Sequence, residues 1–562
     1  MKEYKSILLI KVPYCTHPDA VSKDDDFRNK STFRPIPSLA LAALCSFFNQ
    51  HKSNDYSLKA VDLNIEAYIA PEISIDILIY PKLLTDCIKN SSYNVLAISA
   101  MFVFNVRWVE MAVKLSRKYH PDAKIIVGGG YPTIFPERAL RDHDIDDVVI
   151  GEGEIAMLHI INKYNNYSDP EFDNKFPFEG YATRDEDGEI KVFQRVHSFL
   201  SGEELPIANW DYLNIDKYIK NSGVNLLPIE GGRGCPYLCT YCSTKFAWGN
   251  KMRLKPVDKM LRECRDIVDK YENLGLSFVD DNLSVVKKWF KSLLKRLIDE
   301  KLTRNVTASN FSVKDIDIEM LDLLAEAGFK TLSVAVETGS EEMQRIVQKK
   351  LDFDLVRKIV GLIKAKGFYV HILWMVGFPN ETLEQIKKTF AFARELNGHT
   401  NQFSIVLPYP GTKLFEQAKS QGLLLVDDRD LDKYDYRKCD YIKSEEWDYQ
   451  MLRDMIYDAI IEMNFLNNPL LETGQGRNVL LEKTKHFLLW LPGHVIANII
   501  IGYIYMIHKN AIESERYYNI AVDLLKDKNI SNTFNKYLLM DHPIIKDFNH
   551  HKLSITLQGT IN

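Results

Sequence analysis

Apolar runs of strand length alternate with amphipathic stretches in two parts of this sequence, residues 1–165 and residues 224–424. In the first part, buried strands are predicted at 6–13, 58–64, 95–101, 124–128 and 147–150. Helical patterns lie between them, for example at 37–49 and 106–119. Strands that alternate with helices pair in parallel, so residues 1–165 are predicted to form a Rossmann-like, doubly wound parallel sheet.

The second part repeats the strand–helix unit six times. Its strands are expected at 225–229, 276–279, 305–308, 331–336, 369–375 and 402–407. Six units are too few for a closed barrel of eight, so the pattern predicts a partial (β/α)6 barrel of the TIM type. In both kinds of fold, ligands bind on the loops that follow the carboxyl ends of the strands.

The chain is long enough for several domains. It has 562 residues, of which 46% are hydrophobic and 26% charged, a composition typical of globular proteins. We predict an α/β fold in four parts: the Rossmann-like sheet at 1–165, a connector with a hairpin at 166–220, the partial barrel at 221–425 and a helical region at 426–562. The last part is interpreted as a cap that excludes water from the barrel mouth.

Three cysteines, Cys235, Cys239 and Cys242, stand in one short segment directly after an apolar run. Three thiolates from one local loop can hold a cubic iron–sulfur cluster by three corners and leave the fourth iron without a protein ligand. A small molecule can then bind that iron directly. Zinc is the alternative, but it needs a fourth ligand, and the nearest candidates, His197 and Cys264, are not well spaced for it.

The spacing Cys-x3-Cys-x2-Cys, with the aromatic Tyr241 before the last cysteine, resembles the signature of the radical S-adenosylmethionine (SAM) enzymes. The resemblance implies a 4Fe–4S cluster on Cys235, Cys239 and Cys242, whose open iron takes the amino and carboxylate groups of SAM. It further implies that an electron from the cluster splits the sulfonium to give a 5′-deoxyadenosyl radical. The implied electron donor is a carrier such as flavodoxin or ferredoxin.

Other elements that resemble this family follow the barrel strands in order. Residues 280–282 replace its Gly-Gly-Glu element, and a carboxylate there can accept hydrogen bonds from the SAM ammonium group, with a helix N-cap as the alternative role. Glu337 stands where the family places a polar residue for the ribose hydroxyls. Residues 377–382 resemble the turn beside the adenine, with Asn380 in place of a glycine, and residues 408–412 match the Pro-x-Pro-Gly-Thr element. The implied SAM contacts are Tyr241, Asp280, Asp281, Ser309, Asn310, Glu337, Gly377 and Pro379.

The strand ends of residues 1–165 carry a serine and several glycines, which let a broad planar ligand approach the backbone. The ordered set resembles the cobalamin-binding domain that precedes many radical SAM modules. The corrin contacts that this implies are Ser99, Met101, Gly128, Gly129, Gly130, Gly151 and Glu152. The Asp-x-His-x-x-Gly loop is missing and His17 does not match it, so the cobalt is expected to lack a lower histidine ligand. A degenerate domain that binds no corrin is the alternative.

Net charge and cysteine usage exclude other classes. The net charge of −5 and the lack of a Lys/Arg stripe argue against nucleic acid as a partner. Eight cysteines, three of them together and the rest scattered, do not form a disulfide framework and suit a reducing cytoplasm. Cys15, Cys45 and Cys87 invite comparison with the second cluster of the radical SAM methylthiotransferases. Cys45 and Cys87 fall in helical patterns, so we interpret them as buried hydrophobic residues and expect no second cluster.

The segment 487–507 is mostly apolar and long enough to span a bilayer, but Pro492, Gly493 and His494 interrupt it. We predict a buried helix pair here. A helix on the membrane surface is the alternative, which would make the protein membrane-associated, and a true span is the third possibility.

The order of a corrin-type sheet followed by a cluster barrel predicts a function. The adenosyl radical abstracts a hydrogen atom from an unactivated carbon, methylcobalamin donates a methyl group, and a second SAM remethylates the cobalt. The alternative is a radical cyclisation, rearrangement or oxidation, with cobalamin as redox partner or absent, and a non-catalytic metal-binding module is a further one. The substrate class stays open between a small molecule, a lipid and a peptide.

Overall fold

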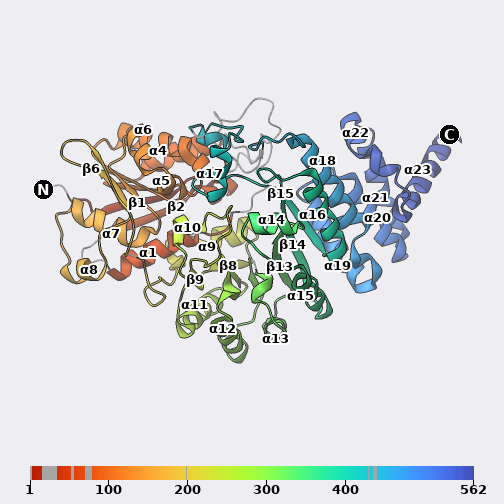
Figure 1. The fold of residues 1–562 in the computed structure, drawn as a ribbon, viewed down its shortest axis with the longest axis horizontal. Coiled ribbons are helices and arrows are strands. Elements are labelled where there is room, and N and C mark those ends of the chain that lie inside the picture. The colour runs from red at the N-terminus through yellow and green to blue at the C-terminus, as the bar shows by residue number, and fades with distance from the viewer. Residues whose placement is uncertain are drawn as a thin grey trace. The chain divides into compact units, whose positions relative to one another are not determined.

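The computed structural model describes residues 3–15, 35–51, 56–69, 79–197, 199–309, 311–427, 429–434 and 440–561. The chain divides into two compact units, and Figure 1 shows their elements. Unit one comprises Met1–Ser333, Gln344–Asp352 and Val406–Ser444, and unit two comprises Val334–Met343, Phe353–Ile405 and Glu445–Asn562. The N-terminal sheet and the first half of the expected barrel therefore belong to the same unit.

A seven-stranded sheet in the order β2-β1-β3-β4-β5-β6-β7 forms the N-terminal part of unit one. Its strands are β1 (Ser6–Lys11), β2 (Ser57–Asp62), β3 (Val95–Ser99), β4 (Lys124–Gly128), β5 (Asp147–Val149), β6 (Tyr181–Arg184) and β7 (Ile190–Phe193). β1 to β5 run parallel, and the β6–β7 hairpin adds to β5 in antiparallel pairing. The strand order reverses between β1 and β3, which is where doubly wound sheets bind their ligands.

The inner strands β1, β3 and β4 are mostly apolar and buried, as expected where helices cover both faces, whereas β2 at the edge exposes Ser57 and Lys59. In β1, every residue after Ser6 is buried. The helices are α1 (Leu39–His51), α2 (Leu63–Ile69), α3 (Ile79–Asn90), α4 (Val106–Tyr119), α5 (Gly130–Ile134), α6 (Pro136–Asp142), α7 (Gly153–Tyr164) and α8 (Pro170–Lys175). α4 shows the helical period clearly, since it buries Trp108, Val109, Ala112 and Val113 on one face.

Unit one also contains the first three barrel strands, β8 (Leu226–Ile229), β11 (Gly275–Phe278) and β12 (Val306–Ala308). They form a parallel sheet in the order β12-β11-β8. The other elements here are α9 (Ile215–Lys217), β9 (Gly232–Arg233), α10 (Thr244–Trp248), β10 (Arg253–Leu254), α11 (Val257–Lys270), α12 (Lys287–Asp299), α13 (Ile318–Glu326) and α17 (Lys413–Ser420). β9 and β10 pair in an antiparallel ladder, which sets Arg233 opposite Arg253.

The other three barrel strands form a sheet in the order β13-β14-β15, which belongs to unit two from Val334 onward. They are β13 (Thr331–Glu337), β14 (Tyr369–Val376) and β15 (Thr400–Ile405). α14 (Glu341–Ile346), α15 (Phe353–Ala365) and α16 (Leu383–Leu396) follow β13 and β14 along the chain. The predicted α/β class, with parallel sheets, a TIM-barrel-like part and a helical C-terminal region, is confirmed.

Six further helices complete unit two: α18 (Tyr449–Ile460), α19 (Gly474–Leu488), α20 (Val495–Ile507), α21 (Ala511–Leu524), α22 (Lys528–Leu538) and α23 (Pro543–Ile561). The apolar segment 487–507 contributes to the core of these helices. Within it, the run 495–501 is buried, and it packs with Tyr518, Phe534 and Phe548 from α21, α22 and α23. Of the predicted buried helix pair, α20 is a buried helix, whereas residues 487–494 contain the end of α19 and a turn in which Leu489 and Leu491 are exposed. Over the described residues, no helix has the length and apolarity that a membrane crossing requires.

Candidate functional site

The three signature cysteines lie half-buried in the loop between β9 and α10. Gly234 opens this loop with a φ of +91°, and a Cβ there would stand 2.3 Å from the carbonyl oxygen of Lys251, so only glycine fits. The Thr240 N–H donates to the Val347 carbonyl at 3.0 Å, and the Leu414 N–H donates to the Thr240 carbonyl at 2.9 Å. Two other segments of unit one therefore hold the middle of the cysteine loop in place.

The thiols of this loop influence one another electrostatically. Burial raises the pKa of the Cys235 thiol to about 11, and a hydrogen bond from the Tyr237 backbone acts against it. The charges of Cys242, Asp281 and Cys239 raise this pKa further. Thiolates that repel one another are stabilised by a cation, and soft sulfur ligands suit the irons of an iron–sulfur cluster. The chemistry of the donor set fits the predicted cluster.

Within the described residues, no group of three or more His, Cys, Asp and Glu side chains is arranged to hold a metal ion, and this holds for the three signature cysteines as well. Of the two candidate fourth ligands for zinc, Cys264 is buried in α11 and His197 is exposed in the connector. No disulfide involves any of the seven cysteines that the structure describes.

Thr244, a buried residue of α10, links one signature cysteine to a predicted SAM contact. Cys242 Sγ lies 3.2 Å from Thr244 Oγ1, and the Thr244 hydroxyl donates to Asp281 Oδ1 at 3.0 Å. A thiolate that ligated iron would carry no proton, so the Thr244 hydroxyl would have to turn its single proton from Asp281 to donate to Cys242. Hydrogen bonds to ligand sulfurs help to set the reduction potential of such clusters.

Asp280 faces the backbone of the cysteine loop. Its Oδ2 accepts from the Gly231 N–H at 3.0 Å and its Oδ1 accepts from the Gly232 N–H at 2.7 Å. The side chain is buried, and burial raises the pKa of Asp280 to about 7 against the effect of these two donors. Asp280 thus ties the end of β11 to the segment that leads into Cys235.

The remaining predicted SAM contacts of unit one lie near this loop or on the same sheet. Tyr241 is half-buried beside Cys242. Ser309 follows β12, where its hydroxyl donates to the Phe278 carbonyl at 3.3 Å. Asn310 lies outside the described residues.

The predicted contacts of unit two lie at the ends of neighbouring strands. Glu337 ends β13 with a φ of +72°, a conformation that is rare for a residue with a side chain. The turn after β14 contains Gly377, with a φ of +83°, and the buried Pro379. Asn380 takes a φ of +60°, which explains why asparagine can stand where the family has glycine.

Glu381 stabilises this turn from inside. Its Oε2 accepts from the backbone N–H groups of Gly377 at 2.6 Å and Phe378 at 3.0 Å. Within the described part of the chain, the other carboxyl oxygen of Glu381 has no hydrogen-bond partner. Burial raises the pKa of this carboxyl to about 8.

The predicted corrin contacts lie at the carboxyl ends of β3, β4 and β5. A Cβ on Gly129 would stand 2.3 Å from the Ala100 carbonyl oxygen, and one on Gly130 would stand 2.1 Å from that of Met101. These two glycines are therefore required by a close approach of two loops of the protein itself. The Met101 side chain is 45% exposed at this edge, and Ser99 is half-buried beside it. An open apolar side chain at the edge where such sheets bind ligands fits a corrin.

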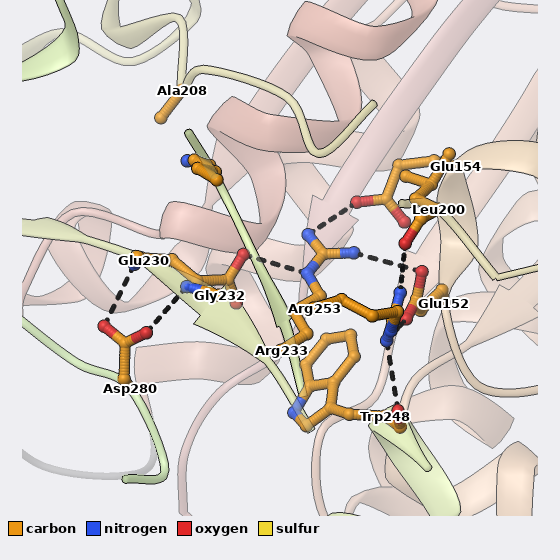
Figure 2. Close-up of polar contacts among 12 residues, drawn as sticks. Glu152, Glu154, Leu200, Ala208, Glu230, Gly232, Arg233, Trp248, Arg253 and Asp280 are labelled. Atoms are coloured by element: carbon orange, nitrogen blue, oxygen red, sulfur yellow. Dashed lines mark hydrogen bonds and ion pairs between the residues drawn. The ribbon is translucent and has the colours of Figure 1, made fainter. Parts of the chain in front are cut away.

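The Glu152 carboxylate does not lie open at this edge. It is buried and paired with Arg253 and, at 3.5 Å, with Arg233 (Figure 2). Glu154 and Arg233, which form a second buried pair, were not predicted as site residues. Charged residues set among glycines beside a strand end were the available signal, but no sequence pattern tells which of them pair.

Two family models match the chain. The model of the Radical SAM superfamily covers residues 229–393, and that of the B12 binding domain covers residues 52–161. The chain is also similar to two curated proteins. An uncharacterized methyltransferase, PH0819 of Pyrococcus horikoshii, is 28% identical over 56% of this chain and 67% of that protein. The anaerobic magnesium-protoporphyrin IX monomethyl ester cyclase of Rubrivivax gelatinosus is 24% identical over 67% of this chain and 68% of that protein.

A solved structure shares the fold. OxsB, described as a cobalamin-dependent SAM radical enzyme with aqua-cobalamin and SAM bound, is superposed with a TM-score of 0.61 and 15% identity. The match covers 98% of this chain and 84% of that one. The residues present fit a cluster and a corrin, and the two domain models occur together as the sequence predicted. The chain therefore combines a radical SAM domain with a B12 binding domain, and these two domains imply SAM, a 4Fe–4S cluster and cobalamin as its cofactors.

Proposed function

We propose that this enzyme transfers a methyl group to an unactivated carbon of a small-molecule substrate. The observation that carries the proposal is that the cysteine loop and the corrin-type sheet edge belong to one compact unit and are joined by the buried pair Glu154–Arg233. When bound, the cofactors supply a radical that removes a hydrogen atom and a transferable methyl group for the resulting carbon radical.

The site residues of unit one have distinct roles in the proposed reaction. Cys235, Cys239 and Cys242 hold the cluster, and Asp280 fixes the backbone before them by accepting two N–H groups. Thr244 Oγ1 lies 3.2 Å from the Cys242 sulfur, so with a cluster bound its hydroxyl would be able to donate to that sulfur and influence the reduction potential of the cluster. Ser99, Met101 and the glycines of 128–130 form the protein side of the corrin contact.

In unit two, Glu337 accepts hydrogen bonds from the ribose hydroxyls of SAM, and the turn with Gly377 and Pro379 lies along the adenine. The Glu381 carboxyl holds that turn by its backbone N–H groups, so the turn is already shaped before SAM binds. The electron comes from a reduced carrier such as flavodoxin or ferredoxin.

The turn between α19 and α20 remains the part of 487–507 that a membrane surface could contact. Leu489 is 70% exposed and Leu491 is 49% exposed, whereas α20 itself is buried. If the substrate is a lipid, the wild type should bind neutral phospholipid vesicles and float with them in a density gradient. The fraction of protein that floats should be smaller for Leu489→Glu. A soluble substrate predicts no flotation of either protein.

The first experiment tests radical formation. The protein is reconstituted with iron and sulfide without oxygen, supplied with hydroxocobalamin, reduced, and mixed with SAM. The proposal expects a bound corrin absorbance and formation of 5′-deoxyadenosine. Cys239→Ala should abolish 5′-deoxyadenosine, whereas the matched change Cys264→Ala, in the buried face of α11, should not. A wild type that binds zinc, or no corrin, contradicts the proposal.

The second experiment separates methylation from the cyclisation that one relative is named for. Cells that express the wild type or Cys239→Ala are fed methionine with a trideuterated methyl group, and their small molecules are compared by mass spectrometry. Methylation predicts a metabolite with the deuterated methyl group that only the wild type makes. An altered metabolite without deuterium would instead support the cyclisation, rearrangement or oxidation alternative.

A further inference from the structure

The segment 151–154 contacts both ends of the cysteine loop. It follows β5 at the corrin edge and leads into α7. At its start, a Cβ on Gly151 would lie 3.4 Å from the carbonyl oxygen of Ala247, in the helix that follows Cys242. At its end, Glu154 meets Arg233, which stands two residues before Cys235. One short segment therefore connects the corrin edge to the residues on either side of the cluster ligands.

Arg233 is the centre of a buried ionic network (Figure 2). Its Nη2 lies 2.8 Å from Glu154 Oε1, and its Nη1 lies 3.5 Å from Glu152 Oε2. Its Nε donates to Glu230 Oε2 at 2.8 Å, and the Trp248 ring stands 4.7 Å from the guanidinium carbon. Two edges of the planar group are therefore fixed by charge-assisted hydrogen bonds and one face by the Trp248 ring, while Nη1 meets Glu152 only in a longer ion pair.

Arg253 of the neighbouring strand β10 also binds the segment 151–154, through Glu152. Its guanidinium pairs with Glu152 and donates to the Leu200 carbonyl at 2.6 Å and to the Trp248 carbonyl at 3.0 Å. Trp248 ends α10, so this arginine also bonds the helix behind the cysteine loop. Because β9 and β10 pair directly, the two arginines act on the segment 151–154 as one rigid element.

Burying these charged groups costs desolvation free energy, so the network is not an efficient source of stability. Buried ion pairs are often no more stabilising than apolar side chains of the same size, although removing one partner leaves a costly unpaired charge. What they do provide is a fixed geometry, since each bond has a required length and direction. A network with such geometry, placed between two cofactor regions, is suited to setting the distance between them.

We propose that the Arg233–Glu154 pair is a positioning device that fixes the cluster loop relative to the corrin edge, so that radical formation and methyl transfer occur at a set separation. This inference rests on the proposed function. Neither residue touches a reacting atom, and both act through the backbone on Cys235 and on the corrin edge. A misplacement of about 1 Å can slow an oriented reaction about 100-fold, so the rate of methyl transfer should depend on the positions that this ion pair fixes.

The test measures the geometry directly. The holoenzyme is prepared with a reduced cluster and cob(II)alamin, which both carry an unpaired electron, and pulsed electron paramagnetic resonance reads their dipolar coupling. The wild type is expected to give one narrow distance. Glu154→Gln, which keeps the shape of the side chain and removes its charge, is expected to broaden or shift this distance distribution. In the same variant, the ratio of labelled product to 5′-deoxyadenosine should fall about tenfold.

Two further variants separate position from stability. Arg233→Lys keeps the charge but loses the planar contacts, so it should fold, bind both cofactors and still broaden the distance. Glu263→Gln breaks another buried pair of unit one, with Lys255 at 2.7 Å, and should lower the melting temperature without changing the distance. If Glu154→Gln does not fold, Arg233→Lys decides the matter.

The outcomes are distinct. A wild-type distance in both Arg233→Lys and Glu154→Gln overturns the positioning role and leaves the proposed function intact. A wild type without corrin or without a cluster signal removes the proposed function, and this inference with it. Broadening in Glu263→Gln as large as in Arg233→Lys would also overturn the inference, because any buried pair would then do the same.

Discussion

Two buried carboxyl groups, Asp280 and Glu381, hold the loops where the cofactors are expected. Each accepts two backbone N–H groups just after a barrel strand, and burial raises the pKa of both, to about 7 and about 8. The raised pKa reflects the cost of placing a full charge in the protein interior, a cost that the two N–H donors at each carboxyl group offset only in part.

The raised pKa of Glu381 predicts a pH dependence of stability. Its ordinary pKa is 4.5, so the folded chain binds this proton more tightly than the unfolded chain does. The free energy of unfolding therefore falls as the pH rises from about 4.5 to about 8, by up to about 1.4 kcal/mol per pH unit, and levels off above that range. In Glu381→Gln, one oxygen can still accept both N–H groups, so this contribution disappears.

Urea unfolding of the cofactor-free protein at pH 5.5 and pH 8 measures the difference. The wild type should lose more stability than Glu381→Gln between these two values. Equal losses in the two proteins would show that Glu381 titrates normally in the folded chain.

Thr244 predicts a shift in the cluster potential. Thr244→Val removes the hydroxyl that lies 3.2 Å from Cys242 Sγ and keeps the side-chain shape. Without this donor the thiolate is more electron-rich, so the reduction potential should become more negative, whereas Thr244→Ser should stay close to the wild type. A redox titration followed by electron paramagnetic resonance measures both. A valine variant with the wild-type potential would mean that the hydroxyl serves Asp281 alone.

At the scale of helices and strands, the C-terminal core depends on a glycine. A Cβ on Gly502 of α20 would lie 2.3 Å from the ring of Tyr518 in α21. Tyr518 cannot move aside easily, because it is buried and its hydroxyl donates to Asp547 of α23. Gly502→Ala is therefore expected to destabilise unit two by about 1–3 kcal/mol.

Gly361→Ala is the matched control for that change. Gly361 also lies inside a helix, α15, but a Cβ there meets no atom within 4 Å. The same substitution should raise stability by up to about 1 kcal/mol, since alanine favours helix more than glycine does. Thermal unfolding compares the two variants. A Gly502→Ala protein as stable as the wild type would show that the α20–α21 contact is looser than described.

The sequence was informative where local pattern decides the structure. The apolar runs predicted β1 and β3, whose side chains are buried on both faces, and the cysteine spacing predicted one loop for all three thiols. The pattern could not show that Gly129 and Gly130 are needed for a close approach to the Ala100 and Met101 backbones. Nor could it show that Asp280 accepts from Gly231 and Gly232, because that contact joins residues far apart in the sequence.

At the scale of the whole molecule, the sequence predicted a connector at residues 166–220. In the structure, the β6–β7 hairpin of this segment belongs to the N-terminal sheet. The six barrel strands are divided between the two units, three in one sheet and three in the other. The Glu154–Arg233 pair, whose members lie 79 positions apart in the sequence, joins the N-terminal sheet to the barrel within unit one. Such long-range pairing depends on the folded geometry, so a single sequence does not reveal it.

The central claim is that three cysteines leave one iron free to bind SAM. Its most direct test is electron–nuclear double resonance of the reduced cluster with SAM that carries nitrogen-15 in its amino group. The account predicts a nitrogen coupling to the cluster that appears with SAM and is absent without it. A cluster spectrum that SAM leaves unchanged, or a loop that binds zinc instead of iron, would contradict it.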